Sequence, residues 1–429
     1  MNRYIQAVAV FFVIFISLKF FEARFLGDMI GIKIPFLFVL LIVSISLIYI
    51  FKCKGAFVLP AQLLTFAMLF SIVSAYLVWG QGVMDSMVKT IPLTLIPFFF
   101  LLAKYKYPVK TLENIILVFG YIYFVLYMYQ LLNPDTAYFG YALVDDTGGY
   151  RESRGVTRVV FPGAGIFWLA CFISLSKLIS NQGNKYILVP LVLLGLAVPV
   201  LQATRQLIGF VVILYFLHFG FQLSLAKKII VSFLLIIGGI YVGALNLPVI
   251  EGLYQETHDT TSEGTKYIRF ITGGYYLTEF SDTFYTKIMG NGFPADRSDY
   301  GAVTIRLIEK GMFLEDVGII GLYSQVGIIG IIAWLFIWYK SFTVILPKEY
   351  YYCKYYLWML LFTCLTSGSI YTVHYAISTT LVLYIYNQVK LNERYKLKQV
   401  IKLLLRRKLV REAHDSRRPG APAYVVSKV

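Results

Sequence analysis

The chain has 429 residues, of which 58% are hydrophobic and only 14% are charged, and its mean hydropathy is +0.70. A soluble globular protein carries about 25% charged and about 45–50% apolar residues, so this composition excludes that class. The net charge of +16 is concentrated near the C-terminus, where twelve basic residues stand against three acidic ones from Lys390 onward. This basic segment favours the anionic face of a membrane. Nucleic-acid binding is not expected, because no folded soluble domain would carry it.

Apolar runs of about 18 or more residues recur along the chain, and each is long enough to cross roughly 30 Å of hydrocarbon. The expected transmembrane helices are 4–22, 34–51, 57–79, 84–103, 111–132, 159–179, 186–203, 206–224, 229–247, 316–339, 355–372 and 374–391. Pro92 and Pro97 are expected to bend the fourth of them. The sequence therefore predicts an all-α, polytopic membrane protein over residues 1–400, with about twelve transmembrane helices, followed by a basic, disordered tail over 401–429.

The charges of the connecting loops orient these helices. With the N-terminus inside, every inner connection contains lysine, and Glu349 is the only acidic residue among them. By the positive-inside rule, both termini are expected in the cytoplasm. Two outer connections, 133–158 and 248–315, are long, and long connections are usually functional. The four cysteines show neither a disulfide framework nor metal-ligand spacing.

The longer outer connection contains the stretch "YIRFITGGYYLTEFSDTFYTKIM". Ile268, Ile271, Tyr275 and Phe280 lie at spacings that could form one apolar helical face. Two interpretations fit this pattern equally well. The helix either lies along the outer membrane surface or packs over the transmembrane bundle.

Arginine and lysine are segregated between the two faces. All eight arginines between Tyr4 and Lys390 fall on the outer side, and they are Arg24, Arg151, Arg154, Arg158, Arg205, Arg269, Arg297 and Arg306. Guanidinium groups bind phosphates through paired, charge-assisted hydrogen bonds, which indicates an anionic ligand such as a lipid-linked phosphate or pyrophosphate. The alternative is that these arginines pair with nearby acids such as Glu152, Glu279, Asp296 or Asp299, or reach out to the interface.

Arg205 is the strongest individual candidate for a functional cation. It lies in "LQATRQLIGF", in a minimal turn between two apolar helices, where a charge so close to hydrocarbon is costly unless it is paired. The stretch "RESRGVTR" adds Arg151, Arg154 and Arg158. If Arg154 and Arg158 begin a helix, their spacing of four places both on one face.

A further constellation is "GNGFPADRSDYGAVTIRLIEKGMFLEDVGIIGLYSQVGIIG". Its first glycines are expected to build a turn, and its later ones to permit close helix packing. Glu315 and Asp316 stand where the tenth helix should begin, so they either cap the helix dipole or serve as a general base. His374, in the turn before the last helix, is either a base, a hydroxyl ligand or a bystander. The motifs of ATP- and dinucleotide-binding proteins are missing, so the protein is not expected to hydrolyse ATP itself.

These features together resemble the O-antigen polymerase (Wzy) family of the O-antigen polymerase and ligase superfamily. The turn "TRQLIG" at Arg205 resembles the family's arginine at a helix start, and "GNG" followed by "EDVGIIGLYSQVGIIG" is similar to its glycine turn and acidic helix start. In the ligase branch a histidine stands eleven residues before the first glycine of a Gly-x-x-Gly pair. Here Gly327 and Gly330 place Asp316 at that position, which favours a polymerase.

The resemblance implies a GT-C-like fold in the bacterial inner membrane with its active site facing the periplasm. The reaction implied is glycosyl transfer from a glycan on undecaprenyl pyrophosphate to a hydroxyl of another lipid-linked repeat unit, without metal or cofactor. Asp316 or Glu315 would take the acceptor proton, with His374 as a possible substitute. The leaving pyrophosphate would be bound by arginines, namely Arg205, Arg154, Arg158, Arg269, Arg297 and Arg306. A chain-length regulator and a flippase would be partners.

Three alternatives remain at the level of sequence. One is an O-antigen ligase. Another is a different lipid-linked-sugar transferase that uses an acidic residue of the first outer loop, where Glu22 and Asp28 lie, and often needs a divalent cation. The third is a flippase or transporter, which is less favoured because such proteins show internal repeats and charges at the membrane midplane.

Overall fold

The computed structural model describes residues 3–27, 29–93, 95–140, 152–153, 156–202, 204–222 and 268–415. The α-helices are α1 (Arg3–Ser17), α2 (Ile34–Leu47), α3 (Val58–Trp79), α4 (Val83–Thr90), α5 (Phe98–Tyr105), α6 (Val109–Leu132), α7 (Ala164–Ile179), α8 (Lys185–Leu201), α9 (Arg205–Gln222), α12 (Ile268–Thr278), α13 (Phe284–Met289), α14 (Asp299–Glu309), α15 (Ile319–Thr343), α16 (Tyr352–Thr363) and α17 (Val373–Asp415). Shorter turns are the 3-10 helices η1 (Lys19–Glu22), η2 (Arg24–Leu26), η4 (Ile91–Leu93), η6 (Leu314–Val317) and η7 (Lys348–Tyr350), and the π-helix η3 (Met29–Lys33). Two strands of two residues, β1 (Glu152–Ser153) and β2 (Val156–Thr157), pair antiparallel.

The fold is almost entirely helical, as the sequence predicts, and several helices suit a membrane. Five are long and apolar enough to cross a bilayer, and they are Tyr4–Glu22, Met29–Leu47, Val58–Trp79, Val109–Leu132 and Ile319–Thr343. Three shorter helices are also apolar: Ala164–Ile179, Lys185–Leu201 and Gln206–Phe219. These findings are consistent with an all-α membrane protein.

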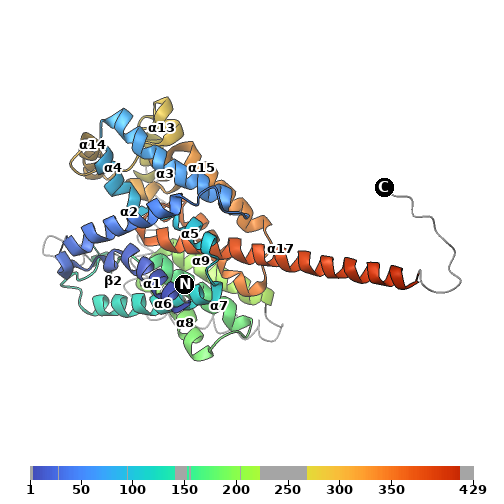
Figure 1. Cartoon of the computed structure of the whole chain (residues 1–429). Coiled ribbons are helices and arrows are strands. Elements are labelled where there is room, and N and C mark those ends of the chain that lie inside the picture. The colour runs from blue at the N-terminus through green and yellow to red at the C-terminus, as the bar shows by residue number, and fades with distance from the viewer. Residues whose placement is uncertain are drawn as a thin grey trace.

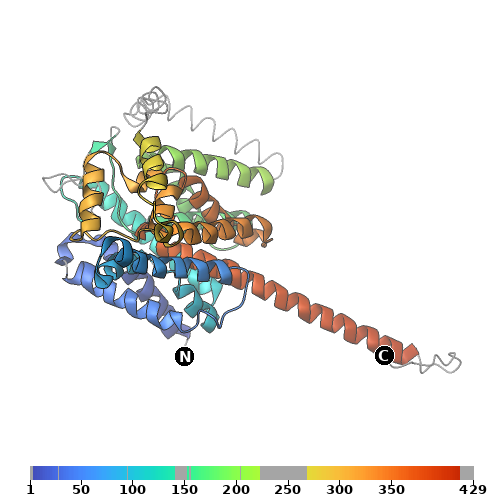
Figure 2. The same cartoon turned by 90° about the horizontal axis from the view of Figure 1, so that it is seen from above.

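Several predicted helix limits differ from the structure. The expected fourth span, 84–103, is interrupted between α4 and α5, around Pro92 and Pro97, since proline lacks the backbone N–H that a continuous helix needs. The expected ninth span, 229–247, lies outside the described residues. The prediction of a disordered tail is wrong for residues 401–415, which continue α17. Their leucines, lysines and arginines are strong helix formers, so the segment needs no packing partner to favour a helix. Figures 1 and 2 show α17 extending well away from the other helices.

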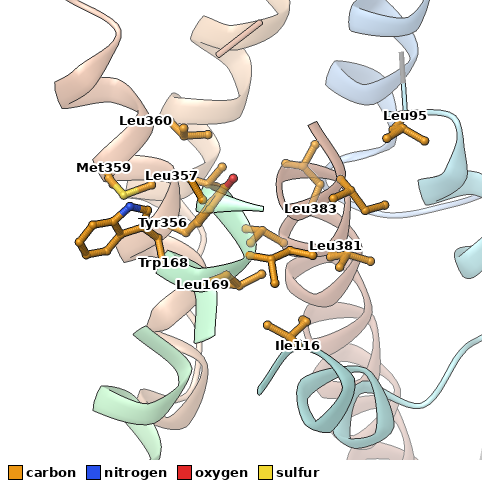
Figure 3. Packing of buried hydrophobic residues seen from close by; sticks show 14 of the residues in the cluster. Leu95, Ile116, Trp168, Leu169, Tyr356, Leu357, Met359, Leu360, Leu381 and Leu383 are labelled. Atoms are coloured by element: carbon orange, nitrogen blue, oxygen red, sulfur yellow. The ribbon is translucent and has the colours of Figure 1, made fainter. Parts of the chain in front are cut away.

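The centre of the bundle is α7. Every residue from Ala164 to Ser176 is buried, which is expected of a helix that is apolar on all sides. Figure 3 shows its Trp168 and Leu169 packed beside Tyr356 and Leu357 of α16, with residues of α17 nearby. This core holds together helices that are far apart in the sequence.

The segment from α12 to α14 packs on the bundle, against α3 and α15, which themselves lie side by side (Figure 1). Trp79, at the end of α3, stacks on Tyr300 of α14 with ring centroids 4.8 Å apart. Of the four residues predicted to form one apolar face, Phe280 is buried and Tyr275 packs on the same cluster, whereas Ile268 and Ile271 are exposed and Tyr276 is buried in their place. The aromatic contacts with α14 and Trp79 decide which side of α12 faces inward.

A buried ionic cluster joins α6, α7 and α16. Glu113 is only 2% exposed, and its carboxylate accepts hydrogen bonds from Lys177 Nζ and from the Tyr352 hydroxyl, both at 2.6 Å. A buried charge is tolerated only when it is paired and hydrogen-bonded, and here both carboxylate oxygens have a partner. The cluster is a structural clamp between three helices.

Candidate functional site

A cavity of about 810 Å³, here called the large cavity, gathers several of the charged residues that the sequence singles out. Its wall includes Arg158, Arg269, Glu315 and Asp316. They come from the segment between β2 and α7, from the first turn of α12 and from η6. The α8–α9 turn adds Thr204 and Gln206 to the same wall, and the connection between α16 and α17 also contributes. The large cavity therefore forms where segments distant in sequence converge.

The position of the two carboxylates depends on the backbone around Gly318. This glycine has φ 53°, and a Cβ there would lie 1.9 Å from the carbonyl oxygen of Cys364, so only glycine fits. Glu315 and Asp316 therefore lie in the separate turn η6, ahead of α15. The N-cap residue of α15 is Gly318, which has no side chain to accept a hydrogen bond, and the two acids precede it in η6.

The two acidic residues differ in their surroundings. Asp316 pairs with Arg269, with Oδ2 and Nη2 3.8 Å apart. Glu315 has no hydrogen bond or ion pair with any side chain that the structure describes. It is accessible from the large cavity, yet the surrounding protein displaces much of its hydration. This desolvation, followed by the charge of Asp316, raises the pKa of Glu315 above its ordinary value.

A second cavity of about 230 Å³, here called the small cavity, adjoins the first. Glu315 and Gln325 line both cavities and so form the wall between them. The remaining polar residues of the small cavity include Lys19, Lys89 and His374. The structure thus places His374 in the same cavity as Glu315, although the two residues are far apart in the sequence.

The helix that carries Gln325 is broken just beyond it. Gly327 has φ 66° and ψ −169°, and a Cβ there would lie 2.2 Å from the carbonyl oxygen of Ile288. Gly327 thus permits the close packing that the sequence predicts, here against the backbone of Ile288 and Gly290, and its positive φ also interrupts α15.

The predicted "GNG" turn fills this break. The backbone N–H of Asn291 donates to the Ser324 carbonyl at 2.7 Å, and the N–H of Gly292 donates to the Gln325 carbonyl at 2.9 Å. The Asn291 side chain accepts from Trp79 Nε1 at 2.9 Å and donates to Ser281 Oγ at 3.1 Å. Non-helical backbone at membrane depth is tolerated when other protein groups satisfy it, as they do here.

The end of α1 contains an unusual backbone turn. Lys19, Phe20, Phe21 and Glu22 all have φ between 50° and 59°, the left-handed region. For L-residues this conformation costs about 1–2 kcal/mol each, so the surrounding packing must hold the turn in place. The turn brings Lys19 to the small cavity and pairs its Nζ with Glu22 Oε1 at 3.4 Å.

Some of the predicted phosphate-binding arginines lie elsewhere. Arg297 and Arg306 are exposed and line neither cavity; Arg297 lies in the turn before α14, and Arg306 lies in the last turn of that helix. The Arg24 Nε donates to the Gly140 carbonyl at 3.0 Å and so ties the first outer connection to the second. Arg151 and Arg154 lie outside the described residues.

The predicted helical turn through Arg154 and Arg158 lies partly outside the described residues. On either side of the gap, Glu152–Ser153 pairs antiparallel with Val156–Thr157, and the next helix begins at Ala164. Arg205 is the first residue of α9, between Thr204 and Gln206 of the large cavity, and its side chain lies outside the described part. Asp28 is likewise outside it.

Sequence reasoning did not identify Lys19, Lys89 or Gln325 as site residues. Lysines near helix ends and a glutamine among glycines carry no distinctive motif, and only the packing brings them together. Among the residues described, no group of three or more His, Cys, Asp and Glu side chains is arranged to hold a metal ion. Comparisons with protein-family models, curated proteins and solved structures find no match to this chain.

Proposed function

We propose that this protein is a membrane glycosyltransferase that polymerises oligosaccharide repeat units carried on undecaprenyl pyrophosphate. The main support for the proposal is the large cavity, whose wall contains both arginines and carboxylates. This cavity lies in a protein with several helices that are long and apolar enough to cross a membrane. Arginines suit the phosphates of such a carrier, and a carboxylate suits the proton of an attacking hydroxyl. The resemblance to the O-antigen polymerase family points the same way.

The proposal includes a complete topology of about twelve transmembrane helices in a GT-C-like arrangement. Both termini lie in the cytoplasm of a bacterial cell, the chain lies in the inner membrane, and the large cavity faces the periplasm. Lysine in every inner connection supports this orientation. A flippase would deliver the substrate, and a chain-length regulator would act with the enzyme.

The chemistry proposed is a single displacement. The acceptor hydroxyl oxygen attacks the anomeric carbon of the donor glycan while the bond from that carbon to the pyrophosphate oxygen breaks. The proton of the hydroxyl passes to a carboxylate, and the undecaprenyl pyrophosphate departs with the negative charge. Arg269, Arg158 and Arg205 stabilise the charge that develops on the leaving group, which is where fixed cations accelerate a reaction most.

Glu315 is a better candidate for the base than Asp316. Asp316 is paired with Arg269, so its carboxylate is already engaged by a side chain of the protein. Glu315 is free of such a pair within the described part of the chain, and its raised pKa brings it closer to the working range of a general base. Asp316 then serves to orient Arg269.

The test is the laddered surface polysaccharide of the native host, analysed by gel after the chromosomal gene is replaced by variants. Arg205→Ala and Arg269→Ala are expected to abolish polymer while single repeat units are still displayed. Arg306→Ala is the matched control, because Arg306 is exposed and outside both cavities, and it should leave the ladder unchanged. A full ladder from the Arg269 and Arg205 variants, at normal protein levels, would rule out the proposed function.

A further inference from the structure

We infer that the small cavity is a binding subsite for an uncharged, hydroxyl-bearing group, and that Gln325 Oε1 is the hydrogen-bond acceptor that holds it. Because the occupant named is the acceptor sugar of the proposed reaction, the inference rests on the proposed function. The observations behind it are the polar atoms of the small cavity, their burial and their charges.

Three buried polar atoms around the small cavity have no hydrogen-bond partner in the described part of the chain. They are Gln325 Oε1, Thr372 Oγ1 and His374 Nδ1. Gln325 is only 6% exposed. An unsatisfied buried acceptor or donor costs about 1–3 kcal/mol, so three of them around one cavity indicate that a ligand supplies the missing hydrogen bonds.

The charges of the small cavity favour an uncharged occupant. The Lys89 Nζ contacts both carboxylate oxygens of Asp296, at 2.8 and 2.9 Å, and Lys19 pairs with Glu22. Both lysines are thus paired with an acid, and the remaining carboxylate of the lining, Glu315, has no cation in the described part of the chain, so an anionic occupant is disfavoured. A group with several hydroxyls can both donate to Gln325 Oε1 and accept or donate at Thr372 and His374.

The size and position of the small cavity suit the end of a glycan. Its 230 Å³ lies below the range of about 300–1,000 Å³ that is usual for drug-sized ligands, so it suits a single sugar ring or a part of one. Glu315 lies on the wall that it shares with the large cavity. A hydroxyl held by Gln325 would therefore be next to the proposed base and to the donor.

The backbone around Gln325 is held firmly, as positioning of a ligand requires. The Gln325 carbonyl is bound by Gly292 and the Ser324 carbonyl by Asn291, within the helix break at Gly327. The left-handed turn at Lys19 lies on the same cavity, and strained backbone of this kind persists mainly at functional sites. Both features fix the wall of the small cavity before a ligand arrives.

The direct test is binding of neutral methyl hexopyranosides and methyl N-acetylhexosaminides to the purified full-length protein in lipid nanodiscs, by saturation-transfer NMR. At least one of these sugars should bind, and Gln325→Leu should weaken its affinity about tenfold, because an acceptor is replaced by an apolar group. Gln325→Glu keeps an acceptor oxygen and should lose less. Ser324→Ala is the matched control, since Ser324 is the buried neighbour that lines neither cavity, and it should bind normally.

A second measurement leaves Gln325 intact, in case its variants fold poorly. Val88 lines the small cavity and is 38% exposed, so Val88→Cys should react with a small methanethiosulfonate reagent. The bound sugar should slow this reaction, while inorganic pyrophosphate should not. The unmodified chain, with Cys171, Cys353 and Cys364 buried and Cys53 half-buried, sets the background.

The outcomes separate this inference from the proposed function. If sugar binding depends on Gln325 while the Arg269 variant still forms polymer, the subsite stands and the polymerase is wrong. Three results would overturn the subsite even if polymer formation requires Arg269. They are that no neutral sugar binds, that Gln325→Leu leaves sugar binding unchanged, or that pyrophosphate protects Val88→Cys as well as the sugar does. Each result therefore supports or overturns the inference.

Discussion

Two glutamates in this protein illustrate how different a carboxylate can be in two regions of one bundle. Glu113 is enclosed between α6, α7 and α16, with Lys177 and Tyr352 each 2.6 Å from its oxygens. Glu315 lies in a short turn on the wall between two cavities, and no cationic side chain in the described part of the chain pairs with it. The buried carboxylate of Glu113 stabilises the packing of three helices, whereas the carboxylate of Glu315 remains available to a ligand.

The same contrast extends to the backbone. Around Glu113 the chain is regular helix, and the cluster stabilises it by satisfying every charge. Around Glu315 the backbone has positive φ at Gly318 and Gly327, and nearby at Lys19. Such conformations cost energy and persist when the surrounding structure enforces them, which is common at binding and catalytic sites. The comparison predicts opposite effects for mutations in the two regions.

The largest effect is expected from Glu315→Gln on catalysis. Loss of a general base lowers a transfer rate by about 10²–10⁴-fold, and polymer formation should fall accordingly. In the unmutated enzyme the rate should fall as the pH drops through the pKa of Glu315, which lies above the ordinary glutamate value of about 4.3, because the base must be ionised. The measurement is the pH dependence of polymer formation in membranes supplied with lipid-linked repeat units.

The same variant also has a stability signature. Since the pKa of Glu315 is raised in the folded protein, its ionisation on raising the pH disfavours folding. Glu315→Gln should therefore be at least as stable as the unmutated protein at pH 7, and this advantage should vanish below the glutamate pKa of the unfolded chain. A clear loss of thermal stability at pH 7 would show that Glu315 is structural, like Glu113.

The next largest effect is expected from Glu113→Ala on stability. Removing one partner of a buried pair leaves Lys177 uncompensated and should destabilise the protein by about 3–5 kcal/mol. Unfolding in detergent, followed by circular dichroism, measures the change. The double variant Glu113→Leu with Lys177→Met removes both charges and should recover much of the loss. Equal stability of Glu113→Ala and the unmutated protein would contradict the clamp.

A smaller effect is expected from Gly327→Ala, which tests the helix break. A Cβ at this positive φ meets the Ile288 carbonyl, so the substitution should cost about 1–3 kcal/mol and weaken binding at both cavities. Gly274→Ala in α12 is the control, because nothing lies within 4 Å of its Cβ and alanine is the better helix former. If the two variants were equally stable, α15 would be continuous at residue 327.

The sequence predicted the helical membrane class and many of the helices, because long apolar runs leave few other solutions. It also singled out Glu315, Asp316, Arg269 and Arg158, which the large cavity brings together. It did not indicate that Ile268 and Ile271 of α12 are exposed while Tyr276 is buried, or that Arg297 and Arg306 are exposed and line neither cavity.

What the amino-acid sequence determined by itself is where apolar helices can form and which segments carry arginine, carboxylate and glycine, since these depend on local composition and periodicity. Only the tertiary structure decided that Lys19, Gln325 and Glu315 share a wall and that Glu315, unlike Glu113, is left without a cation in the described part of the chain. Contacts between residues so far apart depend on how the helices pack and on the breaks at Gly318 and Gly327. These breaks are stable only because the Ile288–Gly292 and Cys364 backbones fill the space that a side chain would need.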